Sequence, residues 1–248
     1  NFETQERTLK ASGQLYADIV EANTLPQVVI LAGGLGTRLG SVAENIPKSL
    51  IEVNGKPMLN HILDWAHGQG CRKALVLTGH LGEMFDGFTH RGVSLTFHQE
   101  SEPLGTGGAL WNAMDLLEDE FILLWGDDYH PIDYPSIVSH HRQKSAPMTM
   151  TVTESHESMN LHHQDGLVIA YDKADPKSDF NGYEAGTSIV NKSVVEAHGR
   201  DGKWSWEETV YPALSGLITA HVDNTAFWDM GTPERLSRFE DFLKQGGP

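Results

Sequence analysis

Short apolar segments alternate along the chain with longer amphipathic ones. Residues 28–31 are all apolar and rich in β-branched types, which predicts a strand covered on both faces, as in parallel sheets. Further strands are predicted at 73–78, 93–98, 121–125, 148–153, 167–171 and 186–190. Helices are predicted at 56–67, 106–117, 134–143, 206–215 and 233–244. This alternation indicates a three-layer α/β/α sandwich with a mostly parallel central sheet, a Rossmann-like arrangement.

The first 26 residues differ from the rest of the chain. Leu9, Tyr16 and Ile19 recur at roughly helical spacing, and Pro26 would end a short helix there. Residues 1–26 are therefore predicted to be an N-terminal extension or linker, and residues 27–248 a single domain. The chain begins at Asn1 rather than Met, so loss of an N-terminal fusion partner stays open as an alternative.

Charge and composition narrow the class of protein. Among 248 residues, 18 are Lys or Arg and 34 are Asp or Glu, which gives a net charge of −16. Such an acidic chain is not expected to bind nucleic acid or a membrane surface. A single cysteine, Cys71, excludes an internal disulfide and a cysteine-rich zinc site. With no apolar run long enough to span a membrane and no secretory signal pattern, a cytoplasmic protein is expected.

The 13 histidines do not form a metal-binding motif. Adjacent side chains, as in His140-His141 and His162-His163, do not face one another on a helix or a strand. No HExxH spacing occurs. These histidines are predicted to lie on the surface.

A glycine-rich loop follows the first predicted strand. Its sequence, from residue 31 to 39, is LAGGLGTRL, and such loops let backbone N–H groups approach phosphates. The spacing fits neither a P-loop nor the GxGxxG dinucleotide fingerprint. What remains is GGxGTR, followed by Pro47-Lys48 eleven and twelve residues after Gly36. Arg38 offers a bidentate fork for phosphate oxygens and Lys48 a point charge.

These motifs resemble those of the sugar-phosphate nucleotidyltransferases, whose signature is GGxGTR followed by Pro-Lys. Further matching segments follow in order: EPLGTGGA at 102–109, WGDD at 125–128, YEAG at 183–186 and WDMGTP at 228–233. The likeness runs from residue 27 to about residue 242. It is strongest to the D-glycero-D-manno-heptose 1-phosphate guanylyltransferases and their hexose 1-phosphate relatives. The resemblance implies the fold of the nucleotide-diphospho-sugar transferases, with residues 27–248 as the nucleotidyltransferase domain.

Two carboxylates come directly after a predicted buried strand. Asp127 and Asp128 follow residues 121–125, and carboxylates at such a place need water, a partner or a metal ion. Mg²⁺ is typically held by one or two carboxylates together with substrate phosphates. The resemblance implies that Asp127 and Asp229 bind Mg²⁺, whereas Asp128 varies in the family.

The implied reaction joins a nucleoside triphosphate to a sugar 1-phosphate. A phosphate oxygen of the sugar attacks the α-phosphorus and pyrophosphate leaves, so no general base is required. Positioning and electrostatic stabilisation remain the main tasks. We expect Arg38 to bind the β- and γ-phosphates and Lys48 to bind the α-phosphate or bridge to the sugar phosphate. Together with Asp127 they form the predicted catalytic set.

The resemblance also implies which residues bind each substrate. Gly105, Thr106 and Gly107 would lie against the base, and Thr106 could also cap the following helix. The form of this segment favours GTP, while UTP and CTP stay open. Lys173 would hold the sugar phosphate, and Glu184, where many relatives have Asn, the sugar hydroxyls beside Gly186. The complete nucleotide-binding set is Leu31, Ala32, Gly33, Gly34, Gly36, Thr37, Glu102, Gly105, Thr106 and Gly107.

Three alternatives to a guanylyltransferase remain at this stage. The first is a uridylyl- or cytidylyltransferase that acts on another phosphorylated substrate. The second is a catalytically silent, nucleotide-binding regulatory subunit, although that reading would expect loss of Lys48 or of a metal ligand. The third is a nucleotide-dependent glycosyltransferase, which would not be expected to carry GGxGTR with Pro-Lys. A homo-oligomer is possible in each case.

Overall fold

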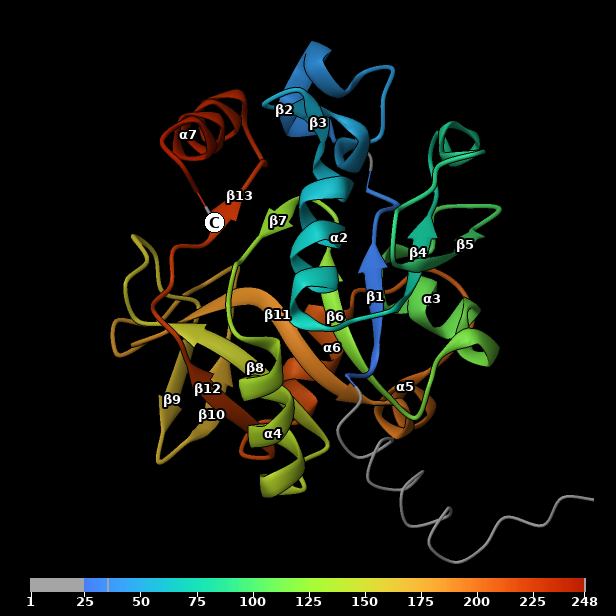
Figure 1. Ribbon diagram of the computed structural model, residues 1–248. Coiled ribbons are helices and arrows are strands. Elements are labelled where there is room, and N and C mark those ends of the chain that lie inside the picture. The colour runs from blue at the N-terminus through green and yellow to red at the C-terminus, as the bar shows by residue number, and fades with distance from the viewer. Residues whose placement is uncertain (1–24, 35, 248) are drawn as a thin grey trace, which may run out of the picture.

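The computed structural model describes residues 25–34 and 36–247, so residues 1–24 of the predicted extension lie outside the described part. Nine of the described strands form one sheet in the order β5-β4-β1-β6-β11-β8-β12-β10-β9 (Figure 1). The strands are β1 (Gln27–Leu31), β4 (Lys73–Thr78), β5 (Ser94–Gln99), β6 (Glu120–Trp125), β8 (Met148–Thr153), β9 (Leu161–Gln164), β10 (Leu167–Tyr171), β11 (Tyr183–Asn191) and β12 (Ile218–Val222).

Strand direction divides this sheet into two parts. β5, β4, β1 and β6 are parallel neighbours. β11 then runs antiparallel to both β6 and β8, and β10 runs antiparallel to both β12 and β9. The predicted three-layer sandwich is confirmed, with a sheet that is mostly parallel but mixed.

Helices cover both faces of the sheet because the strand residues are apolar on both sides. Val28 and Ile30 of β1 belong to one core cluster, with side chains from α2, α4 and α7. Val29 and Leu31 belong to a second cluster, with side chains from α3, α5 and α6. Figure 1 shows α2 and α4 on the near face of the sheet. The helices are α2 (Met58–Gln69), α3 (Gly105–Asn112), α4 (Tyr134–Lys144), α5 (Lys192–His198), α6 (Trp206–Ala213) and α7 (Pro233–Lys244).

Several short elements lie near the carboxyl ends of the parallel strands. The strands β7 (Asp128–Tyr129) and β13 (Trp228–Asp229) pair antiparallel, so that Asp229 lies opposite Asp128. A two-stranded hairpin is made by β2 (Glu52–Val53) and β3 (Lys56–Pro57). Short 3₁₀ helices span Thr37–Ala43, Lys48–Leu50 and Gly82–Phe85, and another, Met114–Leu116, lies at the opposite end of the strands, where Gln27 Nε2 donates to Leu116 O at 3.2 Å.

Most predicted elements are present, with some changes at their ends. The strands at 73–78, 148–153 and 167–171 and the helix at 233–244 have the predicted bounds, and Thr232 Oγ1 caps that helix by accepting from Arg235 N at 3.3 Å. The helix expected at 106–117 ends at Asn112 and resumes as a 3₁₀ turn. β9, β12 and α5 were not predicted. Within the described part of the chain, no helix has the length and apolarity needed to cross a membrane.

The prediction for His141 is wrong. Its side chain is buried in α4, not exposed. Nδ1 lies 2.8 Å from Thr149 Oγ1 and Nε2 lies 3.0 Å from Asn191 Oδ1. Because both ring nitrogens have partners in the neighbouring strands, burial leaves neither of them unpaired.

Candidate active site

The glycine loop is held between the carboxyl ends of three parallel strands. Ala32 N donates to Leu77 O at 2.8 Å, and Gly126 N donates to Leu31 O at 2.9 Å. Gly36 adopts φ +66°, and a Cβ there would lie 2.8 Å from Ala43 Cβ and 3.2 Å from Lys48 Cγ. Glycine at position 36 is therefore required both by the backbone and by the close approach of Lys48.

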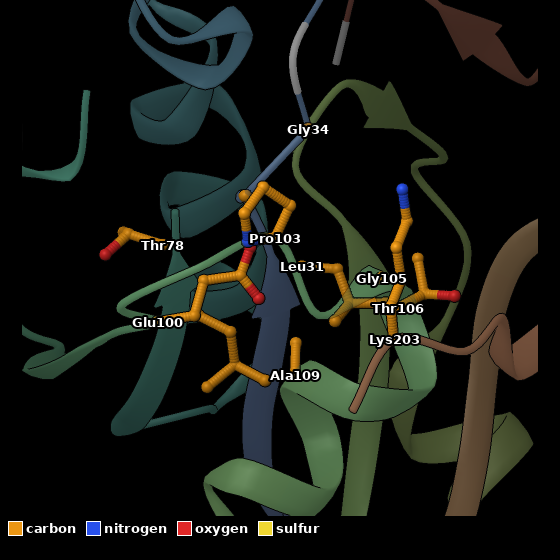
Figure 2. A pocket seen from close by; sticks show the side chains of 11 residues that line it. Leu31, Gly34, Thr78, Glu100, Pro103, Gly105, Thr106, Ala109 and Lys203 are labelled. Atoms are coloured by element: carbon orange, nitrogen blue, oxygen red, sulfur yellow. The ribbon is translucent and has the colours of Figure 1, made fainter. Parts of the chain in front are cut away.

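A cavity of about 590 Å³ opens on one side of this loop (Figure 2). Five of the predicted nucleotide-binding residues line it, and they come from the loop and from the start of α3: Leu31, Gly33, Gly34, Gly105 and Thr106. Leu77, Thr78, Glu100, Pro103, Ala109 and Lys203 complete the wall. Four other predicted nucleotide-binding residues are not part of this lining: Ala32, Gly36, Glu102 and Gly107. The side chain of the remaining one, Thr37, lies outside the described part of the structure.

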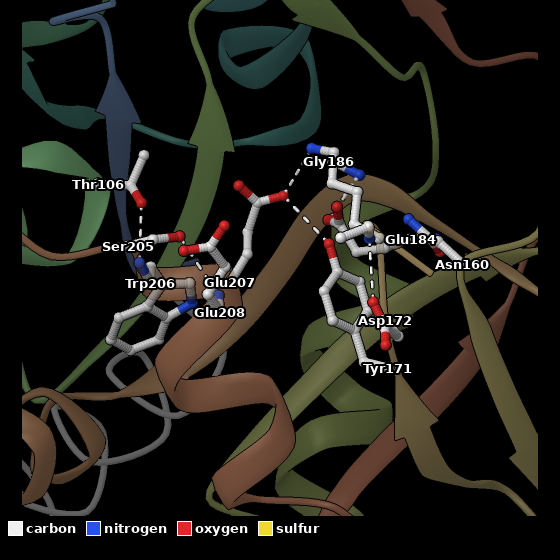
Figure 3. Close-up of polar contacts among 12 residues, drawn as sticks. Thr106, Asn160, Tyr171, Asp172, Glu184, Gly186, Ser205, Trp206, Glu207 and Glu208 are labelled. Atoms are coloured by element: carbon white, nitrogen blue, oxygen red, sulfur yellow. Dashed lines mark hydrogen bonds and ion pairs between the residues drawn. The ribbon is translucent and has the colours of Figure 1, made fainter. Parts of the chain in front are cut away.

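The start of α3 packs against the segment that precedes α6. Gly107 N donates to Trp204 O at 3.0 Å, and a Cβ on Gly107 would overlap the ring of Trp204. Trp206 N donates to Thr106 Oγ1 at 2.9 Å (Figure 3). The prediction that Thr106 caps α3 is therefore wrong. Its hydroxyl joins α3 to α6 instead. This packing carries Lys203 to the cavity wall.

Glu100 is a cavity residue that the sequence motifs do not include. Its Oε2 accepts from Leu104 N at 3.2 Å. A Cβ at Gly79 would lie 2.6 Å from its Oε1, so glycine there leaves room for the carboxylate. Burial raises the pKa of Glu100, although the bond from Leu104 and the charge of Lys203 act in the opposite direction. The signal in the sequence is its place directly after a parallel strand, where ligands of such sheets bind.

A second cavity, of about 720 Å³, holds the acidic residues. Lys48 Nζ lies 2.6 Å from Asp127 Oδ2, and Arg235 Nη1 lies 2.6 Å from Asp229 Oδ2. Met230 N donates to Asp127 O at 2.9 Å, which ties the two aspartate-bearing segments together. The structure brings five of the predicted site residues together in the lining of this cavity: Arg38, Asp127, Lys173, Glu184 and Asp229. The rest of the lining consists of Trp125, Asp128, Tyr183, Glu207, Phe227 and Arg235.

The donor set of this cavity fits a magnesium ion that is shared with a substrate. Within residues 25–34 and 36–247, no group of three or more His, Cys, Asp or Glu side chains is arranged as a metal site. Asp127 and Asp229, however, supply two carboxylates that are partly open, with side chains 26% and 17% exposed. Mg²⁺ takes oxygen ligands and commonly binds one or two carboxylates plus phosphates. These two residues could therefore hold it once phosphate is present.

Two carboxyl groups in the lining of this cavity, those of Asp128 and Glu184, have raised pKa values. Burial raises the pKa of Asp128 well above its usual range, and the charges of Asp127, Asp229 and Glu184 act in the same direction. Burial, reinforced by Glu207, raises the pKa of Glu184 to about 7. Such shifts are common where a protein binds ligands.

Gly186 and Asn160 position these carboxylates. Gly186 N donates to Glu184 Oε1 at 2.9 Å, and Glu184 N donates to Asn160 Oδ1 at 2.9 Å (Figure 3). Gly186 adopts φ +72°, and a Cβ there would lie 2.9 Å from Asp128 Oδ2. The glycine thus lets the backbone of β11 pass close to Asp128.

Glu207 of α6 organises the far wall of the cavity. Its Oε1 accepts from Lys173 Nζ at 2.9 Å and from Tyr171 OH at 3.2 Å (Figure 3). Lys173 is thereby directed along the wall that also carries Glu184. The sequence motifs do not include Glu207, and no local pattern distinguishes it from other acidic residues at a helix start.

The fold and the site together define a class of protein. A glycine-rich loop with cations and a pair of carboxylates, at the carboxyl ends of parallel strands, is suited to phosphoryl-type transfer from a nucleotide. The family model described as "Nucleotidyl transferase" matches residues 27–173, more than half of the chain. The chain belongs to the nucleotidyl transferase family.

Relatives with established names agree with this assignment. The chain is 29% identical over 227 residues to the D-glycero-alpha-D-manno-heptose 1-phosphate guanylyltransferase of Aneurinibacillus thermoaerophilus, covering 88% of this chain and 98% of the relative. It is 31% identical to the mannose-1-phosphate guanylyltransferase catalytic subunit beta of Drosophila pseudoobscura pseudoobscura, covering 84% and 60% respectively. The crystal structure of HddC from Yersinia pseudotuberculosis complexed with GMP-PN matches with a TM-score of 0.77 and 28% identity, covering 88% of this chain and 100% of that one.

Proposed function

We propose that residues 27–248 transfer a guanylyl group from GTP to a sugar 1-phosphate and release pyrophosphate. One observation carries the proposal: the glycine loop contributes to two cavities, with Gly33 and Gly34 in the first and Arg38 in the second. A nucleotide whose base lies in the first cavity would carry its phosphates past this loop toward Lys48 and the carboxylates. The names of the relatives, which are guanylyltransferases acting on heptose or mannose 1-phosphate, support the same reaction.

The chemical step follows from this arrangement. An oxygen of the sugar phosphate forms a bond to the α-phosphorus of GTP, and the bond from that phosphorus to the bridging oxygen of pyrophosphate breaks. Lys48 would contact the α-phosphate and Arg38 the β- and γ-phosphates, since both reach the loop from adjacent 3₁₀ helices. Their charges would offset the repulsion between two polyanions and stabilise the transition state.

Asp127 and Asp229 are the proposed magnesium ligands. Their carboxylates are partly open, they are paired with Lys48 and Arg235 respectively, and both line the cavity that Arg38 also lines. Magnesium, when bound, would neutralise phosphate charge and join the two substrates. Asp128, which lies opposite Asp229 in the β7–β13 pair, would line the cavity beside them.

Glu100 supports guanine as the base. Guanine presents two neighbouring donors, N1–H and N2–H₂, and a carboxylate accepts from both. Neither uracil nor cytosine presents such a pair of adjacent donors. Glu100 stands in the wall of the first cavity, held in place by Leu104 N (Figure 2).

Glu184 and Lys173 would bind the sugar 1-phosphate. Glu184 lies at the buried end of the second cavity, where a carboxyl group can accept from sugar hydroxyls and, when protonated, also donate to them. Lys173 lines the same wall and can exchange its bond to Glu207 for one to phosphate.

Pyrophosphate release with Mg²⁺ tests the proposal directly. GTP, ATP, CTP, UTP and dTTP would each be combined with a panel of hexose and heptose 1-phosphates. Release with GTP that depends on one sugar phosphate is the expected result. Release with CTP or UTP alone would contradict the assignment of the base. GTP binding by calorimetry with no turnover across the panel would favour a regulatory protein.

A further inference from the structure

Asp229 is already engaged by a cation of the protein itself. Arg235 Nη1 lies 2.6 Å from Asp229 Oδ2, and Gly231 N donates to Asp229 Oδ1 at 2.8 Å. Both carboxylate oxygens therefore have a partner before any ligand binds. Arg235 is in the first turn of α7, six residues after Asp229, so the strand–turn–helix segment brings the two together locally.

This arrangement parallels the one at the other proposed metal ligand. Asp127 Oδ2 is engaged by Lys48 Nζ at the same distance, 2.6 Å. A divalent cation that binds both carboxylates would have to compete with Lys48 on one side and with Arg235 on the other. Lys48 belongs to the glycine-loop motif, whereas Arg235 belongs to none of the motifs in the sequence.

We propose that Arg235 is a positioning residue that holds Asp229 in the metal-free protein and transfers to phosphate when a divalent cation takes its place. The inference rests on the proposed function, because it assumes that Asp229 is a cation ligand. The guanidinium group of Arg235 would have to move only a short way from Asp229 to reach phosphate bound beside Arg38. Arg235 and Arg38 line the same cavity, and a Cβ at Gly231 would lie 3.5 Å from Arg38 Nη2, so both guanidinium groups border the segment 229–231. A guanidinium freed there can bind phosphate oxygens in bidentate fashion.

The proposal predicts effects of opposite sign on the two ligands. The pair is partly solvated, with Arg235 43% exposed, so its removal should tighten the binding of a divalent cation alone by about threefold. Loss of a charge-assisted bond to phosphate should weaken binding of pyrophosphate in the presence of that cation by about tenfold. A merely structural role would not move the two affinities in opposite directions.

The experiment measures Mn²⁺ binding by electron paramagnetic resonance, first with the protein alone and then with inorganic pyrophosphate. The variant is Arg235→Gln, with Arg235→Lys as a variant that retains the charge. Arg238→Gln is the matched control, because Arg238 lies one turn further along α7 and Nη2 donates to Glu234 Oε1 at 3.0 Å instead. Circular dichroism and thermal unfolding establish that each variant is folded.

The outcomes separate this inference from the proposed function. Tighter Mn²⁺ and weaker pyrophosphate binding for Arg235→Gln alone would support the transfer. Equal effects of Arg235→Gln and Arg238→Gln, or no change in Mn²⁺ affinity, would overturn it while leaving the metal site intact. If Asp229→Asn binds Mn²⁺ as the wild type does, the metal assignment itself fails.

Discussion

Glu184→Gln is expected to remove a pH dependence of stability that the buried carboxyl group imposes. Glu184 is only 6% exposed, and burial, reinforced by Glu207, raises its pKa from 4.5 to about 7. The folded state thus binds this proton more tightly than the unfolded state. A group of this kind contributes stability at low pH and loses that contribution as the pH rises between the two pKa values.

The size of the effect follows from the two pKa values. A single site that titrates at 4.5 when unfolded and at about 7 when folded lowers the free energy of unfolding by about 2–3 kcal/mol between about pH 5 and pH 8. Glutamine has nearly the same shape and can still accept from Gly186 N, but it does not titrate. The variant should therefore gain about 2–3 kcal/mol in free energy of unfolding relative to the wild type over the same pH interval.

Urea unfolding at the two pH values measures this difference for both proteins. Titrating groups far from Glu184 are shared and their contributions cancel when the two pH-induced changes are compared, whereas Asp128, whose pKa the charge of Glu184 raises, contributes to the measured difference. Glu196→Gln, on the exposed side of α5, is the matched control and should leave the pH dependence as in the wild type. The difference in free energy of unfolding between variant and wild type is compared at the two pH values. If it changes by less than about 0.5 kcal/mol, burial does not raise the pKa of Glu184 as inferred.

Three further substitutions test the nucleotide side of the site. Lys48→Ala should lower kcat for pyrophosphate release more than tenfold, a loss above about 1.4 kcal/mol; a smaller loss would contradict its contact with the α-phosphate. Glu100→Gln should lower kcat/KM with GTP by about tenfold and leave turnover with ATP, where it is measurable, unchanged; equal losses with the two nucleotides would contradict base recognition. Gly107→Ala should lower the free energy of unfolding by about 1–3 kcal/mol, because the added methyl meets Trp204. Gly68→Ala, with open space around the new methyl, is its control in thermal unfolding.

The fold could be predicted where the local pattern carries the information. β4 and β10 are largely apolar, β8 alternates apolar residues with threonine, and all three are bounded by polar or turn residues, so their ends match the prediction. α5 spans seven residues and β9 four, too few for a helical or alternating period to be recognised. The direction of β11 depends on pairing with β6 and β8, which are distant in sequence, and no local signal shows it.

The site divides in the same way. The glycine loop, Lys48 and the aspartates could be placed in one site because their motifs follow in the order that the resemblance to the sugar-phosphate nucleotidyltransferases implies. Glu207 and Arg235 could not be predicted, because each acts through a partner that only the fold brings close. Glu207 pairs with Lys173, which lies two residues after the end of β10, and Arg235 pairs with Asp229. His141 is the same case outside the site, since its two hydrogen-bond partners make burial possible.

A chain with a net charge of −16 can bind polyanions here because several cations gather at this site, and three of them are paired with carboxylates that a divalent cation can take over. In the second cavity Lys48 bonds to Asp127, Arg235 to Asp229, and Lys173 to Glu207. Each of these three cations has a carboxylate partner in the free site, so none of them is an unpaired charge before a ligand binds. Phosphate and a divalent cation can then bind together by exchanging partners, the cation with the carboxylates and the phosphates with the basic side chains. Either ligand alone would leave one half of each pair without a partner, so the binding of the two ligands should be mutually dependent.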